Sequence, residues 1–238
     1  MTNQAKSSAP YWSLEGVALG VRLMLPLVPG MIAFAIAVGS AAAGNGLSFV
    51  ESTLMNVLVY AGVSQLVALG VWPEQLTIAS IAALALLAGT VNARMLLLGA
   101  SLQPWLGPLP AWQTYPMLHL LTDPGWIAAM RYRREGGSDA GVFLGGALLV
   151  FALWMAAASA GYLLGALVPN PRAFALDLVM PIFFAAMLVP LWRGRRRALP
   201  WVVAGVVALA VSYLVEGWWY VIAGSLAGTL AGGFVDDA

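Results

Sequence analysis

The sequence predicts an all-α fold: a polytopic bundle of transmembrane helices with seven or eight spans, some of them interrupted. The first observation is the scarcity of charge, because only 9% of the 238 residues are charged and 61% are hydrophobic. A soluble domain has about 25% charged residues, so a chain this poor in charge could not cover a water-facing surface. The second observation is that the stretches between the charges are long and apolar.

Eight uncharged runs divide the chain, and seven of them have 18 residues or more. A helix needs about 20 apolar residues to cross a bilayer, and these runs lack the strict alternation of a membrane β-barrel. The expected spans are 17–42, 50–71, 75–101, 109–130, 140–168, 174–192, 199–214 and 217–234. The last two are short and form either two spans or one interrupted element. We expect one transmembrane domain over 1–238, with a polar tail at 1–14.

Two arginine clusters set the expected orientation. They consist of Arg131, Arg133 and Arg134, and of Arg193, Arg195, Arg196 and Arg197. Positive residues stay on the cytoplasmic side, and two expected spans separate the clusters. Both clusters and the N-terminus are therefore expected in the cytoplasm.

The composition also excludes several classes of function. The net charge of +1 favours no nucleic acid as a partner. The chain has no cysteine, hence neither disulfides nor thiolate metal sites. It has no G-x-x-x-x-G-K-[ST] loop, so it could not hydrolyse ATP by itself. We expect no cofactor and no metal, and the partners are the lipid bilayer and a small solute.

Small residues indicate how the helices pack. Glycines recur four residues apart at 141 and 145, at 161 and 165, and at 224, 228 and 232, a spacing typical of helices in close contact. A possible internal repeat pairs 54–69 with the segment from Leu178 onward, and 83–102 with 208–227. Duplications of this kind are common in secondary transporters, whose substrate site lies between the repeats.

The first candidate site is LPLVPG at 25–30, inside the first span. Its two prolines each remove a backbone donor and clash with the carbonyl four residues earlier, so the helix should kink or unwind. An unwound segment would offer backbone groups at Pro29 and Gly30 to a substrate. The alternative is a packed kink without a ligand.

The second candidate is YAGVSQ at 60–65, inside the second span. Gly62 weakens the helix there, while Tyr60, Ser64 and Gln65 place polar groups in an apolar stretch. Together with the first motif, backbone N–H groups here could hold a substrate carboxylate. The alternative is hydrogen bonding between helices.

Two further candidates contain the charged residues. Asn92 and Arg94 lie late in the third span, and Arg94 either extends to the membrane surface or faces inward as a counter-charge. The fourth span should break at TDPG (122–125), because the residue before a proline avoids helix. Asp123 is then a proton-carrying acid or the N-cap of the next helix. His119, four residues earlier, would share its face and suit a proton relay.

Four of these stretches, taken in order, resemble the AzlC-type large subunit of branched-chain amino acid exporters. They are LPLVPGMIAFAIA (25–37), GLSFVESTLMNVLVYAGVSQ (46–65), NARMLLLGASLQP (92–104) and LTD (121–123). The resemblance extends over about 14–234, and its later part matches mainly by hydropathy. It implies a proton-driven exporter of valine, leucine, isoleucine and also methionine in the bacterial cytoplasmic membrane. It also implies a small AzlD-type membrane subunit as partner, with a higher oligomer possible.

The sequence departs from the family pattern at three positions. Members often carry histidine and tyrosine where this chain has Met95 and Leu98, and glutamate where it has Pro124. These changes put the substrate and the proton coupling in question more than the fold. A channel, or a carrier for another small solute, is the first alternative. An intramembrane serine hydrolase, with Ser64 as nucleophile and His119 as base, would need the two side chains within hydrogen-bond reach, and we expect no enzyme.

Overall fold

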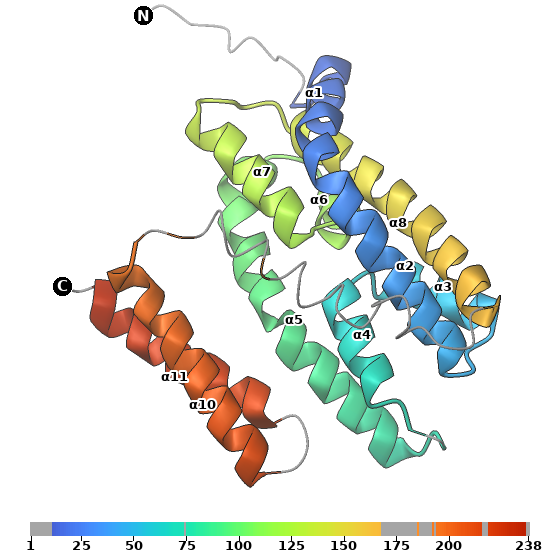
Figure 1. The fold of residues 1–238 in the computed structure, drawn as a ribbon. Helices are drawn as coiled ribbons and strands as arrows, with labels where there is room; N and C mark the ends of the chain where they lie inside the picture. The colour runs from blue at the N-terminus through green and yellow to red at the C-terminus, as the bar shows by residue number, and fades with distance from the viewer. Residues whose placement is uncertain are drawn as a thin grey trace, which may run out of the picture. The chain divides into compact units, whose positions relative to one another are not determined.

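The structure is a computed structural model and describes residues 11–73, 75–167, 185, 192, 194–215 and 219–236. Every regular element in this described part is helical, which confirms the predicted all-α class (Figure 1). The chain divides into two compact units, 1–180 and 181–238, and each is considered by itself. Most of the expected span 174–192 and the repeat segment from Leu178 onward lie outside the described residues. One transporter domain over 1–238 stays a prediction.

Three helical segments of the described residues are long and apolar enough to cross a membrane. The first, Leu14–Gly44, consists of α1 (Leu14–Met24), the 3₁₀ turn η1 (Leu25–Leu27) and α2 (Val28–Gly44). The second is α5 (Ile78–Leu106), and the third is most of α8 (Gly141–Leu167). At a rise of 1.5 Å per residue each extends for roughly 40 Å, which is enough to cross a bilayer.

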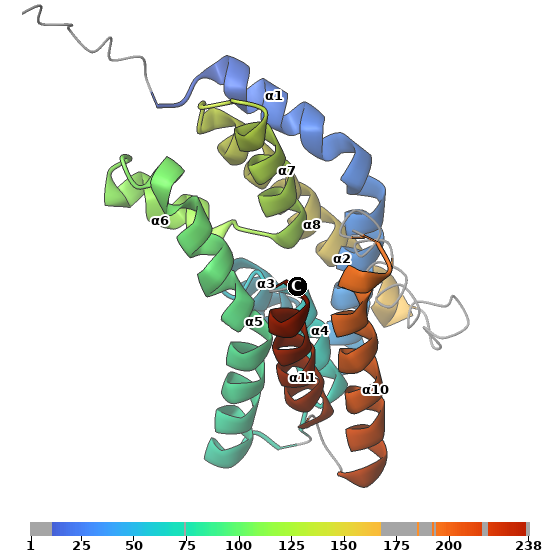
Figure 2. The same ribbon diagram turned by 90° about the vertical axis from the view of Figure 1, so that its left-hand side faces the viewer.

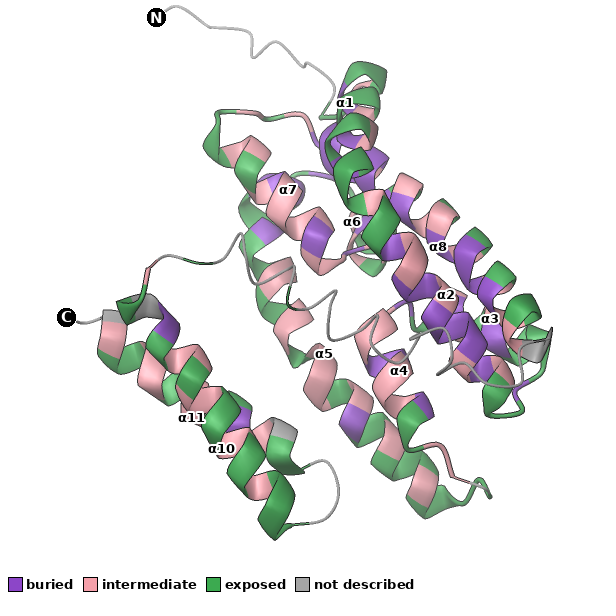
Figure 3. Ribbon diagram, in the orientation of Figure 1, coloured by how far each residue is buried: buried purple, intermediate pink, exposed green. Residues whose placement is uncertain are grey.

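The first of these segments lies along α8 in the same direction, backbone against backbone (Figure 1). A Cβ added to Gly20 would collide with the Val142 carbonyl, and one added to Gly161 would collide with Ile36. The start of the first segment thus contacts the start of α8, and its end contacts the end of α8, so the two run parallel. The packing role predicted for the glycine pairs 141/145 and 161/165 is confirmed, because each of these four positions faces α1, α2 or the segment just before α1. This close pair is also where burial is densest in unit 1 (Figure 3).

Hydrogen bonds join several helix ends at one end of unit 1, here called the proximal end. The Ser13 N–H donates to Asp139 Oδ1 (3.0 Å), so the starts of α1 and α8 lie together. Trp105 Nε1 donates to the Ser138 carbonyl (2.9 Å), which brings the C-terminal end of α5 there too. The opposite end, where α2 ends, is the distal end. The arginines at 131–134 and the start of α1 therefore share one end, as the charge pattern predicted.

The predicted second span is a hairpin of two short helices, α3 (Phe49–Leu58) and α4 (Gly62–Gly70). α3 runs against α8: the rings of Phe49 and Tyr162 lie 5.4 Å apart, and Asn56 bonds Trp154. α3 thus rises from the distal end to Trp154, which is the middle residue of the 27-residue helix α8. After the break at 59–61 the chain turns back, because Gln65 in α4 reaches Asn56 in α3 (3.3 Å).

The predicted fourth span is a second hairpin, α6 (Ala111–His119) and α7 (Asp123–Arg134), and it enters from the proximal end. α6 descends along α5, so that Leu118 comes to lie opposite Gly99. α7 climbs back along the same helix. Its contacts with α5 advance in register, from Asp123–Arg94 (2.9 Å) through Trp126–Ser101 (2.8 Å) to the Arg133 guanidinium 5.3 Å from the Trp105 ring.

The prediction that 50–71 and 109–130 each cross the membrane once is therefore wrong. Both stretches are long and uncharged enough, but each reverses direction at its middle. A helix of 9–12 residues extends for roughly 14–18 Å, about half of the hydrocarbon core. The described part of unit 1 has three segments long and apolar enough to cross a membrane and two re-entrant hairpins, where the sequence predicted five spans. Figure 2 shows α6 and α7 in the half of unit 1 that contains α1, and α3 and α4 farther toward the distal end.

Unit 2 contains the short 3₁₀ turn η5 (Arg196–Ala198) followed by α10 (Leu199–Leu214) and α11 (Trp219–Asp236). α10 and α11 pack side by side, with Gly224 and Gly228 of α11 against Ala204 of α10, so the predicted packing role of these glycines is confirmed. The two segments 83–102 and 208–227, which the possible internal repeat pairs, do not have the same secondary structure. Residues 83–102 lie inside the continuous helix α5, whereas 208–227 include the end of α10 and the start of α11.

Candidate functional site

The two hairpins meet tip to tip, and we call this place the break junction (residues 57–62 and 119–123). His119, the last residue of α6, bonds through Nε2 to the carbonyl of Val57 in α3 (2.8 Å). The rings of His119 and Tyr60 lie 6.2 Å apart, and those of Tyr60 and Trp154 lie 6.3 Å apart. Because Trp154 is the middle residue of α8, the junction lies halfway along a membrane-crossing helix.

Local geometry explains why the chain reverses at Tyr60. Its φ is +41°, and it is the only non-glycine residue with a positive φ in the described part of the chain. For a side chain other than glycine this left-handed conformation costs about 1–2 kcal/mol. Such strain persists only where surrounding contacts over-determine it, and it is concentrated at functional sites. Here the Tyr60 ring packs on Phe151 at 5.2 Å, which holds the strained residue in place.

Four helix ends converge at the junction. α3 and α6 end there, so the negative ends of their dipoles meet at the junction, while α4 and α7 begin there with the positive ends of theirs. Thr122 caps α7 by accepting from the Gly125 N–H (3.2 Å), but no side chain caps α4. Since a carbonyl can only accept, His119 donates to Val57 from a protonated Nε2, which leaves Nδ1 of the neutral ring as an acceptor.

A buried polar network supports the α3–α4 side of the junction. Asn56, which is 2% exposed, accepts from Trp154 Nε1 (2.8 Å) and from Gln65 Nε2 (3.3 Å). Ser64 is fully buried and accepts from Asn92 Nδ2 (2.9 Å), which ties α4 to α5. The Tyr60 hydroxyl and Gln65 Oε1 are buried and have no hydrogen-bond partner among the described residues. Burying polar atoms without a partner costs free energy, so these two atoms are a further source of strain beside the junction.

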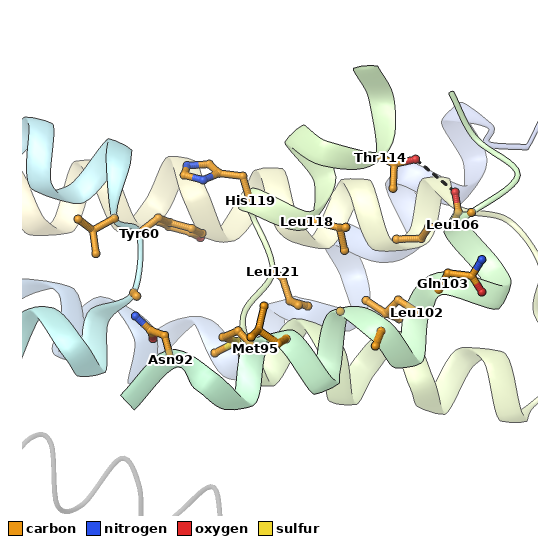
Figure 4. A pocket seen from close by; sticks show the side chains of 16 residues that line it. Tyr60, Asn92, Met95, Leu102, Gln103, Leu106, Thr114, Leu118, His119 and Leu121 are labelled. Carbon is orange, nitrogen blue, oxygen red and sulfur yellow. Dashed lines mark hydrogen bonds between the residues drawn. The ribbon is translucent and has the colours of Figure 1, made fainter. Parts of the chain in front are cut away.

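A cavity of about 560 Å³ begins at the junction and follows one face of α5 from Asn92 to Gly107. This volume is within the range of about 300–1,000 Å³ found for small-molecule sites. In Figure 4 the polar side chains of Tyr60, Asn92 and His119 lie at one end, followed by Met95, Leu118 and Leu121. None of the described residues that line the cavity is Lys, Arg, Asp or Glu. The arrangement suits a small, largely apolar solute with a polar end.

The comparison with known families agrees with this geometry. The sequence model of the family described as AzlC protein matches residues 26–168. The chain belongs to the AzlC family. The match runs from η1 to the end of α8 and so includes both hairpins and the cavity, which confirms the resemblance seen in the sequence over more than half of the chain. No curated protein and no solved structure matches the chain.

Membership in the AzlC family makes the chain a transport-associated membrane protein, in agreement with its long apolar helices. Of the predicted site residues, Tyr60, Asn92 and His119 line the cavity of this AzlC chain. Gly62, Ser64 and Gln65 are not among the residues that line the cavity. A Cβ on Gly62 would collide with the Trp154 ring and closely approach that of Phe34, so its role there is close packing.

Pro29 and Gly30 are exposed and are not among the residues that line the cavity. The prolines tighten the helix into the single turn η1, and α2 follows directly, so the chain kinks without unwinding. The Leu25 N–H still donates to the Val21 carbonyl. Of the alternatives for this motif, the structure matches the kink, because proline is tolerated in the first turn of a helix.

Arg94 and Asp123 form an ion pair at 2.9 Å, with side chains 41% and 21% exposed, and neither lines the cavity. Arg94 lies twelve residues before the end of α5, so its expected place near the end of the span is wrong. Thr122, not Asp123, is the N-cap of α7. His119 and Asp123 do not share a helical face, because the chain breaks between them and their hydrogen bonds lead to Val57 and to Arg94.

One of the three departures from the AzlC pattern touches the cavity. Met95 lines it, whereas Leu98 packs against the buried cluster around Leu102 and Trp105. Pro124 is buried in the first turn of α7, a position that needs no backbone donor. The departure at 95 is therefore the one that can alter which solute fits.

The sequence analysis did not single out Asn56 and Trp154. Asn56 could have been found from the sequence, because it is a lone amide in an apolar stretch four residues before Tyr60. The geometry also bears on the hydrolase alternative: the Ser64 hydroxyl donates to the Ala61 carbonyl (3.0 Å) and accepts from Asn92, while His119 Nε2 is held by Val57. These bonds give the two side chains different partners, and a fully buried hydroxyl offers a substrate no access.

Proposed function

We propose that this AzlC-family protein is the large subunit of a secondary exporter of branched-chain amino acids in the bacterial cytoplasmic membrane. Valine, leucine and isoleucine are the main substrates and methionine a further one. The observation that carries the proposal is the cavity that begins where two re-entrant hairpins meet, halfway along α8. Irregular backbone at membrane depth is tolerated where it is buried or lines a cavity, and transporters bind substrates at such broken helices.

The chemistry of the junction suits the common part of an amino acid. The negative dipole ends of α3 and α6 favour an ammonium group, and the uncapped start of α4 offers N–H groups for a carboxylate. Asn92 provides a further polar contact beside them. An aliphatic side chain would then lie against Met95, Leu118 and Leu121.

Proton coupling is assigned to Asp123, with His119 at the tip of the same hairpin. The Asp123 carboxylate holds α7 to α5 through Arg94, and the hairpin also carries Leu118 and Leu121 of the cavity wall. Protonation of Asp123 removes the charge that attracts Arg94 and frees the hairpin to move. Such a movement would change access to the cavity from one side of the membrane to the other.

The proposal includes a small AzlD-type membrane subunit, a cytoplasmic N-terminus and room for a higher oligomer. α5 exposes Ile81, Leu86 and Leu97, each at least 54% exposed, on a helix that crosses the bilayer. Apolar surface of this extent is expected to face lipid or another membrane chain. A partner subunit along α5 would also lie beside the cavity.

The test is the export of preloaded labelled L-valine from cells that express this chain with or without the small subunit. Saturable efflux that needs both chains and stops when the proton gradient is collapsed supports the proposal. Efflux that persists without the gradient contradicts proton coupling. Efflux that never saturates with internal valine favours a channel, and no efflux of any branched-chain amino acid contradicts the proposed substrate class.

A further inference from the structure

We infer that Gly99 sets the upper size limit for the substrate side chain; this deepens the proposed function and rests on it. Gly99 lies on the cavity face of α5, two helical turns after Asn92, with Met95 on the turn between them. Asn92 belongs to the polar end of the cavity and Met95 to the apolar middle. A substrate whose polar groups lie at the break junction therefore directs its side chain past Met95 toward Gly99.

The surroundings of Gly99 show that no packing requirement explains this glycine. A Cβ added there would have as nearest atoms Cδ2 of Leu118 at 3.9 Å and Cδ2 of Leu121 at 4.0 Å, both ordinary van der Waals distances. By contrast, a Cβ at Gly20, Gly39 or Gly161 would collide with the backbone of a neighbouring helix. Those glycines permit close approach of helices, and Gly99 does not.

Backbone conformation does not explain this glycine either. Gly99 lies within the regular helix α5 and does not have a positive φ. Glycine within a helix lowers stability relative to alanine, and neither packing nor backbone conformation at position 99 compensates for that loss. What the missing side chain leaves is space, bounded on the far side by Leu118 and Leu121 of the α6–α7 hairpin.

The test substitutes Gly99 with alanine, valine and leucine in the full chain, expressed with its small subunit. Efflux of preloaded labelled alanine, valine, leucine, methionine and phenylalanine is compared within each variant. In a hydrophobic pocket one methylene changes discrimination by about tenfold or more. We expect Gly99→Leu to lower leucine and methionine efflux about tenfold relative to alanine, with Gly99→Val between it and Gly99→Ala.

Gly89→Leu is the matched control. Gly89 lies on the same helix, has nothing within 4 Å of an added Cβ, and does not line the cavity. The same increase in side-chain volume there should leave the ratios between amino acids unchanged. Leu118→Ala is the converse variant, which enlarges the cavity opposite Gly99 and should raise phenylalanine efflux relative to valine.

The outcomes separate the inference from the function on which it rests. If wild-type protein exports valine but the ratios of the Gly99 variants match those of Gly89→Leu, Gly99 does not limit size and the inference is overturned. Should Gly99→Leu fail to reach the membrane, Gly99→Ala, Gly99→Val and Leu118→Ala decide the question by the direction of their shifts. If wild-type protein exports none of the five amino acids, the proposed function and this inference fail together.

Discussion

The two re-entrant hairpins of unit 1 have similar lengths, but they are held by different kinds of contact. The α3–α4 hairpin is joined to α8 and α5 through Asn56 and Ser64, which are 2% and 0% exposed. The α6–α7 hairpin is joined to α5 through the partly exposed pair Arg94–Asp123 and the exposed bond from Trp126 to Ser101. Breaking a buried bond leaves polar groups unsatisfied, whereas the attraction within the ion pair ends as soon as Asp123 takes up a proton. We therefore interpret α3–α4 as the fixed wall of the site and α6–α7 as its movable wall.

The largest expected effect is on transport. Asp123→Asn removes the charge that attracts Arg94 and the group that takes up a proton, so gradient-driven valine efflux should be lost. The asparagine amide oxygen can still accept from Arg94, so the free energy of unfolding should fall by about 1–2 kcal/mol, the difference between a charged and a neutral acceptor. Efflux and thermal unfolding of the purified protein measure the two effects.

Glu135→Gln is the control for that substitution, because it breaks the exposed pair Arg131–Glu135 in the same hairpin. It should change neither efflux nor stability. Normal gradient-driven efflux in Asp123→Asn would show that Asp123 serves only as a link between α7 and α5.

The largest effect on stability is expected in the fixed wall. Asn56→Ala leaves the buried donors Trp154 Nε1 and Gln65 Nε2 without their acceptor. At about 1–3 kcal/mol for each of the two unsatisfied buried groups, the free energy of unfolding should fall by about 2–6 kcal/mol. Thermal unfolding in detergent measures it, with Thr53→Ala on the same helix as the control. A loss no larger than that of Thr53→Ala would contradict the proposed difference between the walls.

A smaller effect is expected where the two walls touch. His119→Ala removes the bond to the Val57 carbonyl and should lower stability by about 1 kcal/mol. His119→Gln keeps an N–H donor and should lose less. If both variants lose equally, the bond from His119 is not what joins the hairpin tips.

The smallest expected effect is a difference in amide hydrogen exchange between the two hairpins of the wild-type protein. Amide hydrogen exchange in wild-type protein should be faster in α7 than in α4, because local opening is easiest where contacts are exposed. The buried middle of α8 gives the slow reference. Equal rates in the two hairpins would remove the distinction between a fixed and a movable wall.

The sequence was sufficient for the helical class, the family and the place of both breaks, since prolines, glycines and polar residues in apolar stretches act locally. It was not sufficient for the direction of the chain after each break. That direction depends on bonds between residues of different elements, such as Trp154 to Asn56 and Trp126 to Ser101. The long uncharged runs at 52–73 and 95–122 therefore suggested crossings that the chain does not make.

The site was predictable to a similar degree. Tyr60, Asn92 and His119 were recognisable as polar groups at membrane depth, and they line the cavity. For Pro29 and Gly30 the sequence could not distinguish an unwound segment that binds a ligand from a kink that keeps the chain helical. Gly99 gave no signal, because a glycine in an apolar helix is expected to pack, and only the distances to Leu118 and Leu121 show that it does not.

The antiparallel pairing within each hairpin has an electrostatic consequence. α3 and α4 have 10 and 9 residues and run in opposite directions, so their dipoles nearly cancel at a distance. The field of the helix ends that meet at the junction is therefore of short range. An ion with a single charge is attracted by one set of ends and repelled by the other, whereas a zwitterion is stabilised at both. We therefore expect the hairpin to disfavour simple ions although no charged side chain among the described residues lines the cavity.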